Sequence, residues 1–391
     1  MTIKVYVVDD SAVVRQTLMH LLQGDAEIEL MGSAPNPLIA GPAIRKNRPD
    51  VLLLDIEMPG MDGLTFLRQL MVDCPIPTVI CSTLTAQGSE MALEALSAGA
   101  VAVVSKSGLF FLLNRVTGKP IDPVEERAVE ASDVPGEQAW PTQPFPVVTP
   151  PFARQSFSMD DIATVTPELE AYCRNWITTN NMKFGGPYTP LGFNRPTINF
   201  PGRQGGANWG GGSFDPASGY FFVNSNNLGQ VEVLVKGPDG KIKMGGASGP
   251  GSRFSNPETK LMCQQPPWGQ LTAIDTNTGK IAWQSTLGVS DNVPAAVSAT
   301  GRPNIGGSIS TAGGLVFIGA TDDSRFRAFD ARTGKEVWTW KLDASAHATP
   351  ITYRGKDGRQ YVTVVATGGS FLNSPVSSDS IVAFALPSAS R

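Results

Sequence analysis

Four short apolar runs, each followed by polar side chains, set the strongest limit on how the first hundred residues fold. The runs are Lys4–Val8, Val51–Leu54, Thr78–Cys81 and Val101–Val104. Short, wholly apolar strands that alternate with helices are typical of a parallel sheet covered on both faces. A weaker strand is predicted at Ile28–Gly32, and helical spacing of apolar residues predicts helices at Ser11–Leu22, Leu38–Asn47, Leu64–Met71 and Glu90–Leu96. Pro42 is expected to start or kink the second of these helices.

The polar residues after the strands form the first candidate site. In a doubly wound sheet, ligands bind at the carboxyl ends of the strands, where this sequence has Asp9, Asp10, Asp55, Ser82 and Lys106. Three carboxylates repel one another unless a divalent cation lies among them, and oxygen ligands suit Mg²⁺. A hydroxyl and an ammonium group would complement a phosphoryl group. One such aspartate would be interpreted as merely solvated, whereas this set predicts a metal and phosphoryl site.

Three motifs in this region resemble the receiver domain of response regulators, and more narrowly that of the chemotaxis protein-glutamate methylesterases. They are Val7–Ser11, Leu54–Gly63 and Cys81–Thr85. The resemblance covers residues 1–106 and implies a flavodoxin-like fold with Asp55 as the phosphoacceptor. It also implies Mg²⁺ held by Asp9, Asp10, Asp55 and the carbonyl of Glu57, phosphoryl sensing by Ser82 and Lys106, and a histidine kinase or other phosphodonor as partner.

Two departures from the receiver pattern follow the last strand. The family continues beyond its lysine into a fifth helix, whereas Ser107–Leu113 is strand-like here. The position three residues before the lysine is often aromatic in the family and belongs to its signalling switch, but here it is Val103. We therefore expect a receiver that lacks its last helix and keeps the phosphorylation chemistry rather than the usual output.

A repeated hairpin pattern characterises the chain after Lys106. Leu271–Trp283 aligns without gaps to Phe326–Trp338 through a shared Ala-x-Asp-x-x-Thr-Gly-Lys-x-x-Trp pattern, and Phe111–Lys119 is a degenerate third copy. Asp and Gly fit a tight turn between two strands, and repeated β-hairpins of this length indicate propeller blades. Further strands are predicted within Gly212–Val223, Leu315–Gly319, Tyr361–Ala366 and Ser380–Leu386. Directly after the copy at Phe111–Lys119, residues 120–151 contain eight prolines, a composition typical of a linker.

Several motifs from about Ala102 to Pro387 resemble the dehydrogenases of alcohols and sugars that depend on pyrroloquinoline quinone (PQQ), most nearly the glucose and quinate type. They include Phe111–Lys119, Gly206–Gly211, Pro267–Gly269, Gly306–Gly314 and Ala348–Pro350. The resemblance implies an eight-bladed propeller with PQQ near its axis, bound by Lys106, Asn208, Trp209 and Asn224. A lysine beside a quinone would stabilise developing negative charge. Trp209 has an alternative role as a packing residue within a blade.

The resemblance also implies what is missing, because the catalytic aspartate and calcium ligands of that family precede the lysine. A receiver sequence stands there instead, so no catalytic dehydrogenase acid is found. We predict a chimera: an α/β receiver over residues 1–106, and an all-β, partial (about half) eight-bladed propeller over 107–391, with the Pro-rich segment 120–151 inserted. The resulting functional hypothesis is a phosphoacceptor receiver joined to a fragment of a PQQ-dependent enzyme that oxidises alcohols or sugars.

Two other functions remain open. The first is a receiver that controls a non-catalytic β-propeller binding module. The second is a protein-glutamate methylesterase, which is disfavoured because that chemistry needs a Ser-His-Asp site. The chain has only His20 and His347 and no Gly-x-Ser-x-Gly elbow.

Charge, hydropathy and cysteines exclude several further classes. Residues 1–106 hold 7 basic and 12 acidic residues, a net charge of −5 against −4 for the whole chain, which argues against nucleic-acid binding. No apolar run is long enough for a membrane helix, and the start lacks a signal peptide, so a cytoplasmic location is expected although the propeller family is periplasmic. Cys74 and Cys81 are predicted core residues. Cys173 and Cys263 could pair, with two free thiols as the default expectation.

Overall fold

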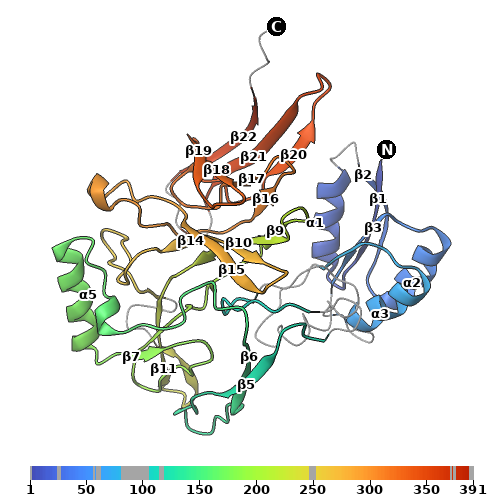
Figure 1. Cartoon of the computed structure of the whole chain (residues 1–391). Coiled ribbons are helices and arrows are strands. Elements are labelled where there is room, and N and C mark those ends of the chain that lie inside the picture. The colour runs from blue at the N-terminus through green and yellow to red at the C-terminus, as the bar shows by residue number, and fades with distance from the viewer. Residues whose placement is uncertain are drawn as a thin grey trace. The chain divides into compact units, whose positions relative to one another are not determined.

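The computed structural model describes residues 2–23, 28–55, 58, 63–80, 105–113, 119–245, 252–369, 372 and 376–386 (Figure 1). The chain divides into two compact units. One comprises Met1–Val103 with Leu112–Ile121, and the other comprises Val104–Phe111 with Asp122–Arg391. The predicted strand Val101–Val104, the predicted helix Glu90–Leu96, and the residues Glu57, Cys81 and Ser82 lie outside the described residues.

The first unit contains a four-stranded sheet in the order β2-β1-β3-β4, with every neighbouring pair parallel. Its strands are β1 (Ile3–Val8), β2 (Ile28–Ala34), β3 (Val51–Leu54) and β4 (Thr78–Ile80), and its helices are α1 (Ala12–Gln23), α2 (Pro37–Lys46) and α3 (Gly63–Asp73). These elements confirm the predicted alternation of strands and helices. Val8, Leu52, Leu54, Ile44 and Phe66 are fully or almost fully buried in one core, because the strands and the helices present apolar faces to one another.

Helix α2 begins earlier than predicted, and Pro42 lies inside it rather than at its start. The start is fixed by Asn36, whose side-chain oxygen accepts a hydrogen bond from the backbone N–H of Ile39 at 3.1 Å. Pro37 follows directly in the first turn, where a proline loses no helical hydrogen bond. The capping pair therefore decides where this helix begins.

The second unit is built almost entirely from antiparallel sheets. The sheets are β15-β14-β10-β9, β16-β17-β18-β19, β20-β21-β22, the hairpin β5-β6, and β12-β11-β8-β7 with β13 paired to β11. Among these described strands β7 and β8 alone pair in parallel, and an isolated parallel bridge joins Phe193 to Leu234. The strands are β5 (Val124–Ala128), β6 (Thr142–Pro146), β7 (Lys183–Gly185), β8 (Thr197–Asn199), β9 (Gly212–Asp215), β10 (Tyr220–Asn226), β11 (Gln230–Lys236), β12 (Ile242–Gly245), β13 (Ser252–Arg253), β14 (Gly269–Asp275), β15 (Lys280–Thr286), β16 (Ser308–Ser310), β17 (Leu315–Ile318), β18 (Arg325–Asp330), β19 (Glu336–Lys341), β20 (Ile351–Arg354), β21 (Gln360–Gly368) and β22 (Ser377–Ala385).

The two close sequence repeats form equivalent hairpins, β14-β15 and β18-β19. Each pairing shifts register at the same place, after Ala273 in one hairpin and after Ala328 in the other. In the first turn, the carboxylate of Asp275 accepts hydrogen bonds from the backbone N–H of Asn277 and the hydroxyl of Thr278. Gly279 follows with φ +69°, a conformation that favours glycine. The Asp-x-x-Thr-Gly pattern thus encodes the turn, as predicted.

At the start of the second unit, composition alone is a poor guide and one prediction was wrong. The Pro-rich segment has a composition typical of a linker but contains a hairpin, in which β5 and β6 pair along their whole length, from Val124 opposite Pro146 to Ala128 opposite Thr142. Prolines are tolerated here because the hairpin is a two-stranded ribbon with free edges. Residues 105–113 form a turn, closed by the bond from Gly108 N–H to the Ser105 carbonyl, and isolated bridges rather than a strand.

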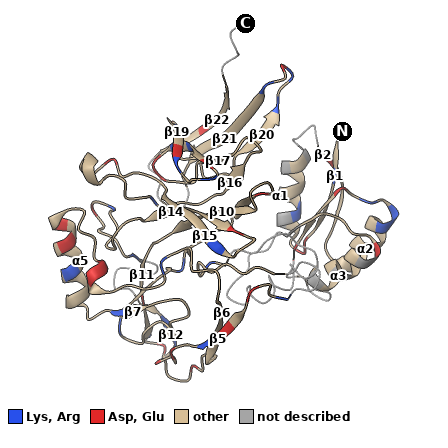
Figure 2. Cartoon of the chain, viewed as in Figure 1, with Lys and Arg blue, Asp and Glu red and all other residues tan. Residues whose placement is uncertain are grey.

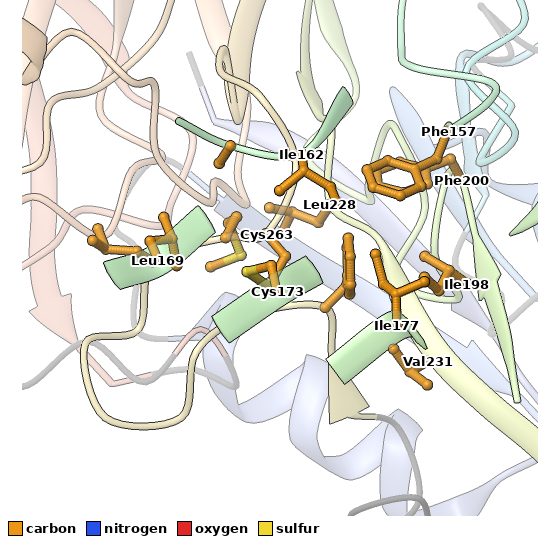
Figure 3. Packing of buried hydrophobic residues seen from close by; sticks show 14 of the residues in the cluster. Phe157, Ile162, Leu169, Cys173, Ile177, Ile198, Phe200, Leu228, Val231 and Cys263 are labelled. Carbon is orange, nitrogen blue, oxygen red and sulfur yellow. A yellow bond between two sulfur atoms is a disulfide. The ribbon is translucent and has the colours of Figure 1, made fainter. Parts of the chain in front are cut away.

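A helical module with a disulfide packs beside these sheets (Figure 3). Helix α5 (Pro167–Thr179) begins after Thr166, whose hydroxyl oxygen accepts from the Leu169 N–H, and two short 3₁₀ turns lie at Met159–Asp161 and Ala295–Val297. Acidic residues occupy the first turn of α5, coloured red in Figure 2, where they complement the helix dipole. Cys173 on α5 is bonded to Cys263, so the expectation of two free thiols was wrong. Cys74 is partly buried and packs against the first unit's core, as predicted.

Candidate functional site

Three carboxylates meet at the carboxyl ends of β1 and β3 in the first unit. Ligand oxygens of Asp9, Asp10 and Asp55 all lie within 4.8 Å of one another. Asp9 is buried, Asp55 is half-buried and Asp10 is exposed. Such a group is held together most readily by a divalent cation with oxygen ligands, because the negative charges otherwise repel one another.

The backbone of the two strands fixes these carboxylates. The N–H of Asp55 donates to the Val8 carbonyl at 2.8 Å, which continues the pairing of β3 with β1. The Arg15 guanidinium from α1 donates to the backbone carbonyls of Asp9 and Asp10 at 2.6 and 2.9 Å. Since these contacts use main-chain atoms, the carboxylate oxygens of Asp10 stay available to a ligand. Sequence reasoning did not identify Arg15.

Lys106 lies in the second unit, beside a glycine-rich loop. Its backbone carbonyl accepts from the Gly206 N–H at 2.7 Å, and the Gly206 carbonyl accepts from the Asn226 N–H at 2.6 Å. A side-chain carbon placed on Gly205 would lie 3.0 Å from the Lys106 Cβ. Lys106, the glycine-rich loop and the end of β10 are far apart in sequence but therefore meet in the structure.

The same loop carries Asn208 and Trp209, the next two predicted site residues. The Asn208 amide donates to the Gln204 carbonyl at 3.1 Å. Trp209 is 69% exposed, so it does not pack inside a blade and its ring is open to a ligand. A side-chain carbon on Gly210 would lie 1.9 Å from the Gly306 carbonyl carbon, which shows that two inner loops are in direct backbone contact.

Asn224 is buried on β10 and belongs to a network of asparagines. It is 4% exposed, and its Nδ2 donates to the Oδ1 of Asn304 at 2.7 Å. Its own Oδ1 is buried without a hydrogen-bond partner among the described residues. Asn226 and Asn304 were missed in the sequence, although Asn224-Ser225-Asn226-Asn227 is an unusually polar end for a strand that is otherwise apolar.

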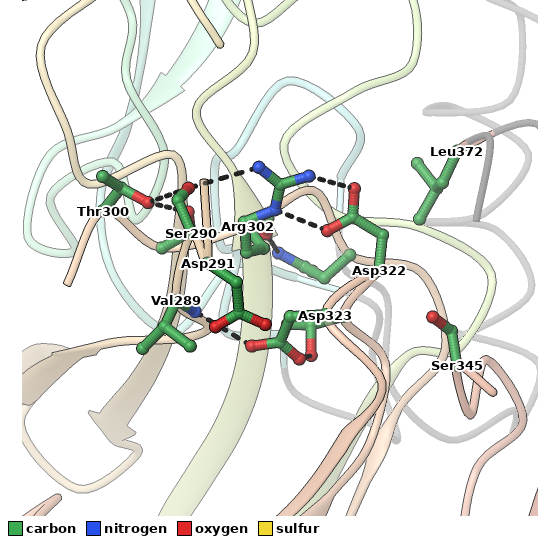
Figure 4. Close-up of polar contacts among 12 residues, drawn as sticks. Val289, Ser290, Asp291, Thr300, Arg302, Asp322, Asp323, Ser345 and Leu372 are labelled. Carbon is green, nitrogen blue, oxygen red and sulfur yellow. Dashed lines mark hydrogen bonds and ion pairs between the residues drawn. The ribbon is translucent and has the colours of Figure 1, made fainter. Parts of the chain in front are cut away.

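A cluster of ion pairs lies in the part of the chain from the end of β15 to β18 (Figure 4). Arg302 donates from two guanidinium nitrogens to the two carboxylate oxygens of Asp322, both at 2.7 Å. Burial by itself lowers the pKa of Arg302, but the bonds to Asp322 outweigh it and hold that pKa above its usual value. Asp323 is paired with Arg327, and both side chains are almost completely buried. The cluster is saturated with internal partners and fastens neighbouring strands rather than offering open groups.

His347 is the one histidine of the propeller region, and its surroundings fit a structural role. One ring nitrogen lies 3.0 Å from the Ala320 carbonyl oxygen. Burial lowers the pKa of the imidazole, and the bond to Ala320 offsets this only in part. The ring is buried and held by a backbone carbonyl, which fits a structural role. None of the described helices is both long and apolar enough to cross a membrane.

Comparison with known proteins gives the class to which these features belong. The family model described as glucose/ethanol/alcohol dehydrogenase, β-propeller domain, matches residues 89–362, and the chain belongs to this family. Residues 5–110 match the response regulator receiver domain. The chain is thus a receiver fold joined to part of a quinoprotein propeller, as predicted. The two matches overlap at 89–110, a range that contains Lys106.

Individual relatives match the two parts separately. The quinate/shikimate dehydrogenase (quinone) of Acinetobacter baylyi is 38% identical over 73% of this chain and 38% of its own length. The glycerol dehydrogenase large subunit of Gluconobacter thailandicus is 37% identical over 74% of this chain and 43% of its own length. A protein-glutamate methylesterase/protein-glutamine glutaminase of Chromobacterium violaceum is 50% identical over 28% of this chain and 30% of its own length. The chain spans less than half the length of each.

Proposed function

We propose that the second unit binds PQQ at the meeting point of Lys106, the loop carrying Asn208 and Trp209, and the end of β10 with Asn224. The observation that carries this proposal is the chain of backbone bonds from Lys106 through Gly206 to Asn226, with the unpartnered Oδ1 of Asn224 nearby in sequence. A cation, amide groups and an exposed indole match a flat, polyanionic, aromatic ligand. The residues present therefore fit the cofactor.

Each residue would have a distinct task at this site. When bound, PQQ supplies the redox chemistry, accepting electrons from an alcohol or sugar. Trp209 would stack on a ring face, and Asn208 and Asn224 would orient the ring edge through their amides. Lys106 would place its positive charge where negative charge develops on reduction, which is the usual role of a fixed cation in catalysis.

We propose further that these residues do not complete a dehydrogenase, with the functional division at Lys106. In the family this chain resembles, the catalytic aspartate and calcium ligands precede the motif lysine, and no candidate for that acid was found in the sequence. The relatives are dehydrogenases of quinate, shikimate and glycerol by name, so polyhydroxylated alcohols are the substrate class expected for a complete site.

Titration of the purified chain with PQQ tests both statements. We expect quenching of tryptophan fluorescence on binding and no reduction of a redox dye after addition of Ca²⁺ and glucose, quinate or glycerol. Trp140 is 74% exposed, far in sequence from the site, so Trp140→Phe should keep the quenching while Trp209→Phe loses most of it. Absence of binding would refute the cofactor assignment, and sustained dye reduction would refute the assignment as an incomplete enzyme.

A second function is favoured by the carboxylates within 4.8 Å of one another. We infer that Asp9, Asp10, Asp55 and the Glu57 carbonyl hold Mg²⁺. An Asp55 oxygen would attack the phosphorus of a phosphodonor such as the phosphohistidine of a histidine kinase, so that the new P–O bond forms as the P–N bond breaks and the donor's imidazole leaves. Ser82 would contact the phosphoryl oxygens. Incubation with acetyl phosphate and Mg²⁺ should label the chain, whereas Asp55→Asn should stay unlabelled and the exposed Asp73→Asn should label normally. Labelling that survives Asp55→Asn would contradict this assignment.

A further inference from the structure

Asn304 is held in one orientation by the backbone around it. It is fully buried, and its side-chain Nδ2 donates to the carbonyl of Ser225 at 2.9 Å and to that of Arg302 at 3.2 Å. Its backbone is fixed as well, since Asn226 bonds both its N–H and its carbonyl through a side-chain amide. Carbonyl oxygens can only accept hydrogen bonds, so the Asn304 amide cannot be turned round without losing both bonds.

This orientation dictates how the neighbouring Asn224 lies. The Oδ1 of Asn304 points at Asn224 and can only accept, so Asn224 must present its NH₂ group there, at 2.7 Å. The assignment of nitrogen and oxygen in an amide normally depends on the surrounding network, and here two backbone carbonyls settle it. The Asn224 oxygen is consequently turned away from Asn304 and is left as a buried acceptor with no partner in the described part of the chain.

We infer that Asn304 is a positioning residue, which fixes Asn224 so that its Oδ1 receives a hydrogen-bond donor from the ligand of this site. This inference rests on the proposed PQQ site. It adds that, in one contact, the ligand donates the hydrogen bond and Asn224 accepts it. A buried acceptor with no donor is costly, so a ligand that supplies an N–H or O–H at this point is favoured. The pyrrole N–H of PQQ is such a donor, whereas the quinone and carboxylate oxygens are acceptors.

A double-mutant cycle on PQQ affinity tests the inference, with the full chain, no substrate, and tryptophan quenching as the readout. Asn224→Ala and Asn304→Ala should each weaken binding about fivefold to tenfold, as expected for one lost hydrogen bond. Because Asn304 acts through Asn224, the double variant should bind no more weakly than Asn224→Ala. Asn292→Ala, which removes an exposed amide bonded to Thr259, should leave affinity unchanged.

The outcomes separate this inference from the proposed function. If the wild-type chain does not bind PQQ, the proposed function is overturned and the inference with it. If it binds, but the losses at 224 and 304 simply add, Asn304 does not act through Asn224 and only the inference is overturned. Unchanged affinity in Asn224→Ala would have the same meaning. Melting curves of each ligand-free variant confirm that the folded protein is being compared.

Discussion

The indole Nε1 of Trp283 donates a hydrogen bond to the backbone carbonyl of Ala331 at 3.0 Å. Trp283 lies on β15 of the first repeat hairpin, and Ala331 lies in the turn of the second. The ring also lies against Gly334 of that turn, where an added side-chain carbon would come within 2.5 Å of it. The Trp and the Thr-Gly of the repeated pattern are therefore two halves of one contact between successive sheets.

Gly334→Ala should be clearly more destabilising than Gly314→Ala. Both glycines have positive φ, +72° and +79°, but a side-chain carbon at Gly314 meets nothing within 4 Å. Gly314→Ala should therefore cost about 1–2 kcal/mol for the left-handed backbone alone. Gly334→Ala should cost about 1–3 kcal/mol more through the clash with Trp283. Urea unfolding monitored by tryptophan fluorescence measures both, and equal losses would show that the Trp283 contact is unimportant.

Removal of the disulfide should destabilise the second unit alone. Cys173 and Cys263 are 90 residues apart and lie in a core with Phe157, Phe200 and Trp268. The double variant Cys173→Ser, Cys263→Ser should lose about 2–5 kcal/mol of unfolding free energy. Cys74→Ser, in the first unit, serves as the control, and calorimetry should show the loss in one transition only. An unchanged thermogram would contradict the prediction.

Local patterns predicted well wherever they settle the structure by themselves. The apolar strands of the first unit and the Asp-x-x-Thr-Gly turns followed from short-range chemistry. The Cys173–Cys263 bond did not, because pairing depends on tertiary packing of α5 against a distant loop. Helix α5 itself was missed, although Thr166, Pro167 and Glu168 are a readable start signal.

In the proposed PQQ site, too, some residues could be predicted from the sequence and others are recognised only from tertiary contacts. Resemblance supplied Lys106, Asn208, Trp209 and Asn224, but nothing in the linear pattern indicated Asn304, which lies 80 residues from Asn224. The proline content of residues 120–151 does not reveal the β5-β6 hairpin, because composition alone does not show that the strands of a two-stranded ribbon accept proline.

Stability of the second unit should fall when acid protonates Asp323. Burial raises the pKa of this carboxyl, but the charge of Arg327 and bonds from Arg327, Thr321 and Val289 outweigh it and hold the pKa below its usual value. The folded state therefore binds the proton less tightly than the unfolded state. The stabilisation is present above the unfolded pKa of about 3.9 and is lost as the pH falls through the lower folded value.

Arg327→Met tests the same pair at neutral pH. It leaves a buried carboxylate without its cation and should cost about 3–5 kcal/mol. The double variant Asp323→Asn, Arg327→Met should lose less than Arg327→Met alone, and its unfolding free energy should depend less on pH below 4 than that of the wild type. A loss in the double variant equal to the sum of the losses in Asp323→Asn and Arg327→Met would show that the pair is not coupled.

Gly210→Ala should impair PQQ binding, whereas Gly211→Ala should not. A side-chain carbon on Gly210 would overlap the backbone of Gly306 and Gly307, while one on Gly211 meets nothing within 4 Å. The first substitution must therefore displace the loop that carries Asn208 and Trp209, and we expect at least a tenfold loss of affinity, roughly 1.4 kcal/mol. Gly211→Ala, at φ +64°, controls for backbone strain. Fluorescence titration compares the two, and matched affinities would exclude a role for this close approach.

The sulfur bridge between Cys173 and Cys263 has a practical consequence for any cleaved form of the protein. It encloses β7 to β13 within one covalent loop. A protease that cuts a single peptide bond inside this loop leaves two pieces that still migrate together on a non-reducing gel. They separate only after a thiol reagent is added, so intact migration without reductant is no proof of an uncut backbone.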